Sequence, residues 1–278
     1  MKLVFLGTGA AEGVPGLWCT CDNCRAIRKA GGRSVRRRTA MAIDDGLLID
    51  CGPDLISAAS ELGLDLSRIR TMLVTHEHSD HLYLPNLEVR SGDFCVSPLP
   101  TLTVYGSESA IPLIREAATS ESARHLETRV VEPFRPFDVE GYRVTPLVAQ
   151  HGRPPMRPLL YAISNHEGAL LYAHDTGPIP EETWAYLANP PDGQSLVFDV
   201  VTIDSTLGTR KDPGSGHLNF SQVVEHRARL AGLGLLKPNA RVFANHFSHG
   251  GVSTHDAILD RFIGSGVEPA YDGLTLLV

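Results

Sequence analysis

The sequence predicts one α/β domain of alternating strands and helices. The 278 residues are 42% hydrophobic and 21% charged, which is enough apolar material for one large hydrophobic core. The chain contains no internal repeat, low-complexity segment or linker that would divide it. Short β-rich runs alternate with helical patterns along its length. We therefore expect residues 1–278 to form a single domain.

The first half of the chain begins with an apolar strand over residues 2–6. The turn that follows, Gly7-Thr8-Gly9, lacks the Lys-Ser/Thr of a phosphate-binding loop and the spacing of a dinucleotide fingerprint, so we expect a structural turn. Two short strands form a hairpin around Asp44-Asp45-Gly46. A helix over 53–64 then leads into an apolar strand over 69–74.

The second half continues the alternation. The expected strands are 99–105, 144–149, 159–164, 169–173, 197–203 and 241–245, with a strand-rich stretch over 129–145. The expected helices are 109–118 and 220–233, and Asn219 caps the second one. Polar residues that follow these strands are candidate site residues, because functional side chains favour loops held by a rigid scaffold.

The stretch from Thr75 to His81 directly follows the strand over 69–74 and reads H-x-H-x-D-H. Three histidines and an aspartate within six residues indicate a metal site, whereas the alternatives are a solvated loop or a pair of core histidines. In an extended chain, His76 and His78 face the same way and can bind one ion. Asp80 and His81 lie further along and can turn toward a second ion. Four side chains cannot saturate two ions, so distant strand ends should supply more ligands.

Other strand ends carry suitable side chains. His151 follows the strand over 144–149, Asp175 follows 169–173, and a carboxylate at Asp175 could bridge two ions. Asp50 ends an apolar strand and is a candidate to orient a ligand imidazole, while His174 is expected to be an orienting neighbour. The histidines that lack this context, and that we expect to be surface or structural, are His125, His166, His226 and His255.

A cysteine cluster near the N-terminus indicates a second kind of metal site. Cys19, Cys21 and Cys24 have C-x-C-x2-C spacing, so three thiolates can converge on one tetrahedral zinc ion that needs only one more ligand. The alternative is three buried reduced thiols. Cys51 is expected in the core, and Cys95 has no partner in the sequence. Five cysteines without a secretory signal favour metal binding and free thiols over disulfides.

The charge balance limits the partners. A formal charge of −7 argues against a mainly electrostatic nucleic-acid binder, but a small anionic substrate is compatible with local arginines and metals. One or two side chains of Arg36, Arg37 and Arg38 could point toward such a substrate. We see neither a signal-peptide core nor a membrane span and expect a cytoplasmic protein without membrane contact. A homodimer is one candidate for the oligomeric state.

The complete pattern resembles the metallo-β-lactamase superfamily. The residues that carry the resemblance are the H-x-H-x-D-H at 76–81, His151, Asp175 and His246, each at a strand end. Within that superfamily the chain is similar to the PhnP phosphodiesterases of the carbon-phosphorus lyase pathway, through Gly7-Thr8-Gly9 to Gly13-Val14-Pro15, the three clustered cysteines and His246-Phe247-Ser248-His249. The resemblance spans most of the chain.

This resemblance implies a four-layer αββα sandwich with two catalytic divalent metals, Mn²⁺ or Zn²⁺, and one structural Zn²⁺. It implies metal-dependent hydrolysis of a small cyclic phosphodiester, such as phosphoribosyl 1,2-cyclic phosphate, by a hydroxide held between the two catalytic ions. The implied ligands are His76, His78 and His151 for one ion, Asp80, His81 and His246 for the other, and Asp175 between them. His249 completes the zinc site of Cys19, Cys21 and Cys24, and the implied catalytic residues are Asp80 and His217, the latter as proton donor to the leaving group.

Three alternatives stay open at the level of sequence. A tRNA 3′-processing nuclease would use the same metals but needs a basic arm, and no Lys/Arg-rich insertion of that length is visible. A lactonase or glyoxalase-type hydrolase is the second alternative, because the metal site alone does not choose between carbon and phosphorus. A binding protein similar to PqqB of PQQ biosynthesis is the third, and an incomplete set of active-site ligands would favour it.

Overall fold

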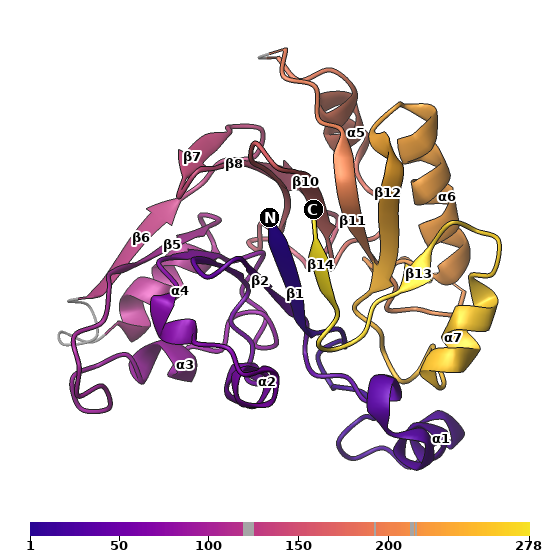
Figure 1. Cartoon of the computed structure of the whole chain (residues 1–278), viewed down its shortest axis with the longest axis horizontal. Coiled ribbons are helices and arrows are strands. Elements are labelled where there is room, and N and C mark those ends of the chain that lie inside the picture. Colours follow the sequence, from indigo (N-terminus) through magenta and orange to yellow (C-terminus); the bar gives the residue numbers. More distant parts are fainter. Residues whose placement is uncertain (119–124, 192, 212–213, 215) are drawn as a thin grey trace.

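The computed structural model describes residues 1–118, 125–191, 193–211, 214 and 216–278. Within these residues the strands form two seven-stranded mixed sheets, with the orders β14-β1-β2-β3-β4-β5-β6 and β13-β12-β11-β10-β9-β8-β7. The two sheets face each other, and helices cover their outer faces, α2 to α4 on one side and α5 to α7 on the other (Figure 1). The expected αββα sandwich is confirmed.

The strands of the first sheet are β1 Lys2–Gly7, β2 Ala40–Ile43, β3 Leu47–Ile49, β4 Thr71–Leu73, β5 Leu102–Gly106, β6 Leu126–Val130 and β14 Thr275–Leu277. Those of the second sheet are β7 Phe137–Val139, β8 Tyr142–Val148, β9 Leu159–Ser164, β10 Ala169–Ala173, β11 Phe198–Asp204, β12 Leu236–Asn245 and β13 Glu268–Pro269. The described helices are α1 Asp22–Ala30, α2 Leu55–Leu62, α3 Pro85–Glu88, α4 Ala110–Ala117, α5 Glu181–Ala188, α6 Phe220–Gly232 and α7 His255–Arg261, with 3-10 turns η1 Gly32–Ser34 and η2 Leu66–Arg68.

Three apolar layers hold the sandwich together. Phe5 and Tyr172 belong to the layer between the sheets, Met72 to the layer under α2 to α4, and Val223 to the layer under α5 to α7. Burying such a side chain contributes about 1.5–3 kcal/mol. The short strands β4 and β10 are buried at every residue because both faces of each sheet are covered, which explains their continuous apolar runs.

The direction of the strands brings the candidate ligands to one edge. β3 and β4 are parallel, as are β10, β11 and β12, so the carboxyl ends within each group lie together. β8 runs antiparallel to β9, which runs antiparallel to β10, so β8 ends at that edge too. The backbone N–H of Leu159 donates to the carbonyl of Thr75 at 2.9 Å and joins the two sheets there. Loops from both sheets therefore lie close together near this hydrogen bond.

Some element boundaries differ from the sequence expectations. The hairpin at Asp44 is confirmed, and Asp44 has a positive φ of 48°. The strand expected at 99 begins only at Leu102, because the proline at 100 has no N–H to donate to a sheet. Helices α1, α3, α5 and α7 were not expected. α1 begins inside the cysteine cluster, where the Cys21 sulfur accepts the N–H of Cys24 as an N-cap.

The expectation that the arginine run faces a substrate is wrong. Arg36 is buried, Arg37 pairs with Glu61 and Asp272, and Arg38 pairs with Asp54. These three side chains therefore stabilise the fold. In the part of the chain that the structure describes, no helix has the length and apolar character needed to cross a bilayer.

Candidate metal centre

The loop after β4 supplies four candidate ligands, of which His76, Asp80 and His81 are buried and His78 is exposed. The first group joins two of them to ligands from the second sheet. His78 Nδ1 lies 2.9 Å from His76 Nε2 and 3.2 Å from His151 Nε2, and Asp175 Oδ2 lies 3.3 Å from His76 Nε2. The ligand atoms of all four residues lie within 4.8 Å of one another.

The second group contains Asp80, His81, Asp175 and His246. His81 Nε2 lies 2.7 Å from Asp175 Oδ2, 3.1 Å from Asp80 Oδ2 and 3.2 Å from His246 Nε2. These four ligand atoms also lie within 4.8 Å of one another. Asp175 belongs to both groups, so its carboxylate lies beside both sets of candidate ligands.

The donor atoms of the two groups fit divalent cations. Ring nitrogens of several imidazoles and the carboxylates of Asp80 and Asp175 converge there. Asp175 Oδ1 is buried and has no hydrogen-bond partner in the described part of the chain. A buried carboxylate oxygen without a partner costs about 1–3 kcal/mol or more, and a bound cation would remove that cost. Asp175 also has a φ of 49°, a strained backbone conformation that is typical of functional positions.

A protein group orients each of four candidate imidazoles through its second nitrogen. Asp50 Oδ2 lies 2.8 Å from Nδ1 of His81, as expected for the carboxylate at the end of β3. The other contacts of this kind are His76 Nδ1 to Thr75 Oγ1 at 3.1 Å, His151 Nδ1 to the Gly216 carbonyl at 3.1 Å and His246 Nδ1 to Thr206 Oγ1 at 2.8 Å. Such partners fix the ring orientation and leave Nε2 for a metal.

His217 lies beside the two groups but is held by a residue that sequence analysis missed. Its Nδ1 is 3.0 Å from Asp204 Oδ2 and 3.4 Å from Asp175 Oδ1. Asp204 is fully buried at the end of β11 and also accepts the backbone N–H of Thr206 and of Leu218. Its place at a strand end, 13 residues before His217, was the signal that could have identified it.

The electrostatics of the site follow from carboxylates in a dry environment. Burial lowers the pKa of His76 well below its usual value. Burial also disfavours the charged ring of His81, but the carboxylates of Asp80, Asp175 and Asp50 outweigh burial and raise the pKa of His81. At His217 burial is likewise outweighed, mainly by Asp204, and the pKa rises to about 9. The carboxylates therefore require positive charge beside them, from protons or from metal ions.

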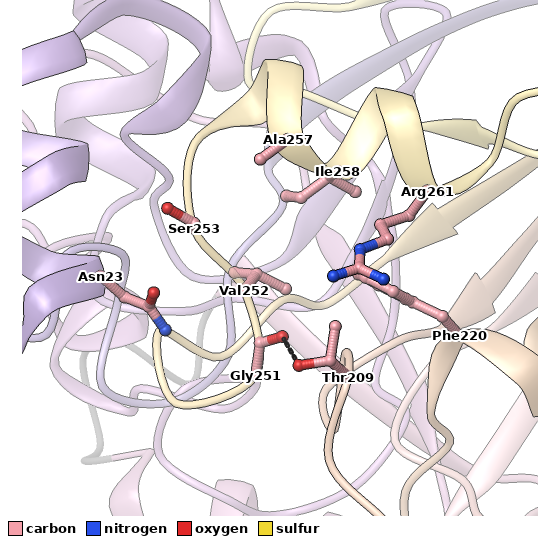
Figure 2. A pocket seen from close by; sticks show the side chains of 9 residues that line it. All are labelled: Asn23, Thr209, Phe220, Gly251, Val252, Ser253, Ala257, Ile258 and Arg261. Atoms are coloured by element: carbon pink, nitrogen blue, oxygen red, sulfur yellow. Dashed lines mark hydrogen bonds between the residues drawn. The ribbon is translucent and has the colours of Figure 1, made fainter.

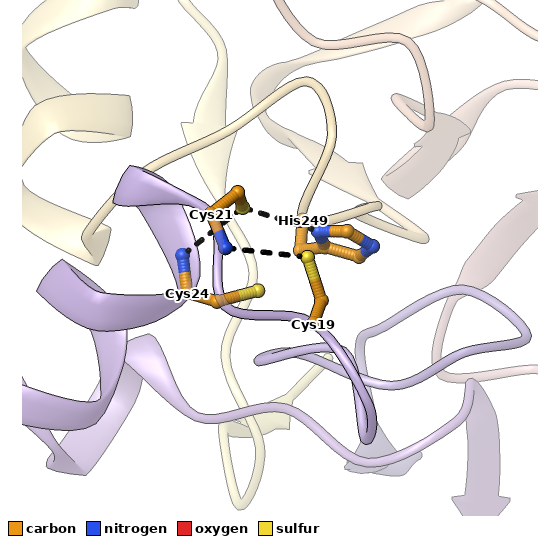
Figure 3. A group of neighbouring side chains, drawn as sticks. All are labelled: Cys19, Cys21, Cys24 and His249. Carbon is orange, nitrogen blue, oxygen red and sulfur yellow. Dashed lines mark hydrogen bonds between the residues drawn. The ribbon is translucent and has the colours of Figure 1, made fainter.

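The cysteine cluster is assembled 19 to 24 residues from the N-terminus together with His249 (Figure 3). The Cys21 sulfur lies 3.7 Å from His249 Nδ1, and all four ligand atoms lie within 4.8 Å of one another. A tetrahedral zinc ion with bonds of about 2.3 Å places sulfurs about 3.8 Å apart, so the cluster fits zinc. The hydrogen bond from the Cys24 N–H is the main cause that lowers the pKa of Cys21 to about 6, which favours the thiolate that binds metal.

A hollow of about 190 Å³ is lined by Asn23, which lies between Cys21 and Cys24 in the sequence, and by Gly251, two residues after His249 (Figure 2). Asn23 Nδ2 donates to the His249 carbonyl at 3.0 Å, and Thr209 Oγ1 donates to the Gly251 carbonyl at 3.3 Å. Thr209 belongs to the chain segment between β11 and His217. The wall of the hollow thus connects the cluster to the segment that carries His217.

The remaining histidines considered in the sequence lie outside the two ligand groups. His174 is buried, and its Nε2 lies 3.0 Å from the Asn245 amide, so it contacts the strand end that precedes His246 and is not placed in either ligand group. His226 accepts the N–H of Ile179, and His255 is a buried partner of Arg36, so both have structural contacts. Part of the loop before His217, residues 212–213 and 215, lies outside the described residues.

Comparison with protein families adds the wider context. The model of the Beta-lactamase superfamily domain matches residues 46–247. An octanoyltransferase of Porphyromonas gingivalis is 32% identical over 56% of this chain, and a ribonuclease Z of Listeria innocua is 28% identical over 55%. These matches span only 32% and 46% of the two relatives, so the chain corresponds to less than half the length of each.

Two solved structures are similar over nearly the whole chain. A diphosphatase from the PhnP family superposes with a TM-score of 0.75 at 22% identity, covering 100% of this chain and 97% of that chain. Zinc-bound PqqB from Methylobacterium extorquens superposes with a TM-score of 0.76 at 18% identity, covering 100% of both chains. At these identities the likeness establishes the shared fold.

Proposed function

The chain belongs to the β-lactamase superfamily, whose metal-dependent hydrolases share its fold, and from this premise we propose that it hydrolyses a small cyclic phosphodiester. The observation that carries the proposal is the pair of four-residue ligand groups that share Asp175, with His217 beside them. His76, His78 and His151 would hold one divalent ion, and Asp80, His81 and His246 the other. The cysteine cluster with His249 would hold a structural zinc.

Two divalent ions in such a site activate water and neutralise the charge of phosphate oxygens. The protein's own contribution begins with orientation, because Asp50, Thr75, Thr206 and the Gly216 carbonyl hold the imidazoles in place. The buried walls of the site exclude bulk water from most of the ligands. An anionic phosphodiester is then favoured over a neutral substrate, because the loaded site carries excess positive charge.

His217 is the proposed proton donor to the leaving group. Its Nδ1 faces Asp204, so proton transfer to a substrate falls to Nε2. The His217 side chain is 19% exposed, so its ring can contact a substrate, whereas the Asp204 side chain is fully buried away from solvent. General acids of this kind contribute about 10²–10⁴ in rate.

The test is hydrolysis by metal-reconstituted protein. We expect manganese- or zinc-dependent turnover of bis(p-nitrophenyl) phosphate or of a 2′,3′-cyclic nucleotide. Asp175→Ala should nearly abolish it, while Asp260→Ala, an exposed carboxylate on α7, should leave it unchanged. Full activity of Asp175→Ala with unchanged metal content would contradict the two-metal site.

The alternative functions are outcomes of the same screen. Lactone hydrolysis without phosphodiester hydrolysis would identify a lactonase-type enzyme, and cleavage of precursor tRNA alone would identify a ribonuclease. Metal-loaded protein without any turnover would favour a binding protein. The similarity to a ribonuclease Z is the reason to test precursor tRNA, and the similarity to PqqB is the reason to consider a binding protein.

A further inference from the structure

An apolar groove opens on the outer face of the first sheet, away from the metal ligands. It has a volume of about 500 Å³ and lies between α2 and α3. Leu48, Met72 and Leu102 of three adjacent strands line it, as does Leu87 of α3. A pocket of this size and lining is typical of small-molecule sites in proteins.

Among the described residues that line the groove, Arg90 is the only cation and none carries a carboxylate. Arg90 Nη2 donates to the Pro100 carbonyl at 2.8 Å, whereas its Nε is buried without a partner. No ion pair to Arg90 occurs in the described part of the chain, and the ionisable groups that act on it are the thiols of Cys51 and Cys95. A desolvated guanidinium without an anion is unfavourable, so the groove lacks a negative group at this point.

A second hollow continues the groove past Arg90. It has a volume of about 370 Å³ and shares Arg90, Cys95 and Leu99 with the groove. His125 also lines it, and none of its described lining residues carries a carboxylate. The rim of the groove on α2 is apolar, since Ile56 is 76% exposed. The arrangement is thus amphipathic, with an apolar groove on one side of a basic group that the second hollow also reaches.

We propose that this groove binds a medium-chain fatty carboxylate, with the alkyl chain between α2 and α3 and the carboxylate at Arg90. The carboxylate accepts hydrogen bonds from the guanidinium, including the buried Nε that otherwise has no acceptor. The alkyl chain lies against the partly exposed Leu64 and Leu66 and removes the exposed Ile56 side chain from water. This site is independent of the proposed hydrolysis.

Calorimetric titration of the metal-loaded full-length protein with hexanoate, octanoate and decanoate tests the site. Each two-methylene step should tighten Kd about tenfold, because each buried methylene contributes a constant increment. Neutral decanamide should bind about tenfold or more weakly than decanoate. Arg90→Gln should remove that difference, and Ala59→Phe on α2 should fill the groove and abolish the dependence on chain length.

Arg135→Gln is the matched control, since Arg135 is exposed and lines neither hollow. Thermal melting of each variant checks that the fold is intact. Absence of decanoate binding to the wild type would overturn the proposal. Equal binding by the wild type, Arg90→Gln and Ala59→Phe would also overturn it, because it would place the carboxylate on the active-site metals. If the wild type is a dimer and Ile56→Asp is a monomer, a second copy of the chain covers the groove, and the fatty-carboxylate proposal is rejected.

Discussion

At the residue scale, the proposed proton donor consists of a partly exposed ring, His217, and the buried carboxylate of Asp204 that holds it. Asp204 makes four kinds of contact, with His217, Thr206, Leu218 and the backbone N–H of Asp175, and it therefore fixes the ring and the loop together. Replacing Asp204 should act through His217 and not through loss of a ligand, because neither of the two proposed metal groups uses its side chain.

We predict that His217→Ala keeps both active-site metals but slows turnover by about 10²–10⁴ for an alkyl leaving group, because the leaving alkoxide loses its proton donor. For a p-nitrophenolate leaving group, which needs little protonation, the loss should be smaller. Rates for a series of leaving groups, with metal content measured in parallel, provide the check. Equal losses across the series would rule out the role as acid.

Single residues also show where sequence reasoning was sufficient and where it was not. The motif at 76–81 was recognisable because four ligands lie within six residues, and His151, Asp175 and His246 because each follows an apolar strand. Asp204 was missed because an acidic residue at a strand end resembles many that are solvated, and its partner lies 13 residues later. Glu12 was also missed. Its carboxylate accepts a hydrogen bond from Ser248 at 2.5 Å and lies 3.7 Å from His249 Nε2, but Ser248 is 236 residues away in the sequence.

At the scale of elements, the segment after β12 links both kinds of metal site. His246 belongs to the second group of candidate ligands, and His249, three residues on, belongs to the cysteine cluster. His246 has a φ of 59°, so its backbone is held in an unusual conformation. A zinc ion at the cluster would fix the far end of this segment and help to hold that conformation.

We predict that Cys21→Ser or His249→Ala lowers thermal stability and weakens loading of the ion proposed at Asp80, His81 and His246. Loading of the ion at His76, His78 and His151 should change less, because no ligand of that ion lies on the segment. Elemental analysis and metal titration of each variant check this, with Cys95→Ser as a control thiol outside the cluster. Wild-type zinc content and unchanged catalytic-metal affinity in His249→Ala would contradict the coupling.

The loop before His217 is a second element with a position-specific requirement. The Gly216 carbonyl lies 3.1 Å from His151 Nδ1, so the loop that carries His217 is tied to a candidate metal ligand. Gly216 has a φ of +79°, and a Cβ there would lie 3.0 Å from the Gln150 carbonyl oxygen and 3.2 Å from His151 Cα. The glycine therefore permits both the backbone conformation and the close approach.

We predict that Gly216→Ala lowers kcat, but by less than the factor of about 10² that a shift of about 1 Å in catalytic groups produces, because contacts of 3.0 and 3.2 Å require their neighbours to move by only a few tenths of an ångström. Gly214→Ala is the matched control, since Gly214 has a φ of +75° but nothing within 4 Å of an added Cβ. Both variants carry the same backbone strain, and only the first displaces His151 and His217. Equal kcat values for the two variants would refute the link.

Elements were predictable where hydrophobic periodicity was strong. Strands β8 to β12 and helix α6 were found, and the capping box of Asn219 and Gln222 confirms the predicted cap. α5 and α7 were missed although α5 is as long as the predicted α2 and α4, because their burial depends on the sheet beneath them. The pairing of β14 with β1 joins residues more than 270 positions apart, which no local pattern encodes.

At the scale of the whole molecule, Arg36 connects segments that follow strands of both sheets. Its Nη1 donates to Thr8 Oγ1 at 2.8 Å, just after β1, and to the Ala270 carbonyl at 2.6 Å, just after β13. The guanidinium also lies 4.2 Å from the ring centroid of Phe247. Nη2 faces His255 Nδ1 at 3.2 Å, so the neutral imidazole must accept this hydrogen bond.

This arrangement makes acid stability depend on His255. Burial, with Arg36 and Arg33 beside it, lowers the pKa of His255 from 6.5 to about 4, and Asp256 opposes this shift. The folded-state pKa is below the unfolded value, so between pH 6.5 and 4 the unfolded chain binds more protons. The free energy of unfolding must therefore fall as the pH falls through this window and level off below it.

We predict that His255→Gln, which keeps an acceptor for Arg36 but cannot be protonated, flattens this part of the stability profile. The loss between pH 6.5 and 4 should be smaller than in the wild type by ~1–2 kcal/mol, an amount reduced for partial solvent access at the ring. Denaturant unfolding at closely spaced pH values measures the difference. His166→Gln, a change at an exposed histidine, is the control and should reproduce the wild-type slope. Parallel profiles for the wild type and His255→Gln would show that the Arg36 contact does not set the acid sensitivity of the sandwich.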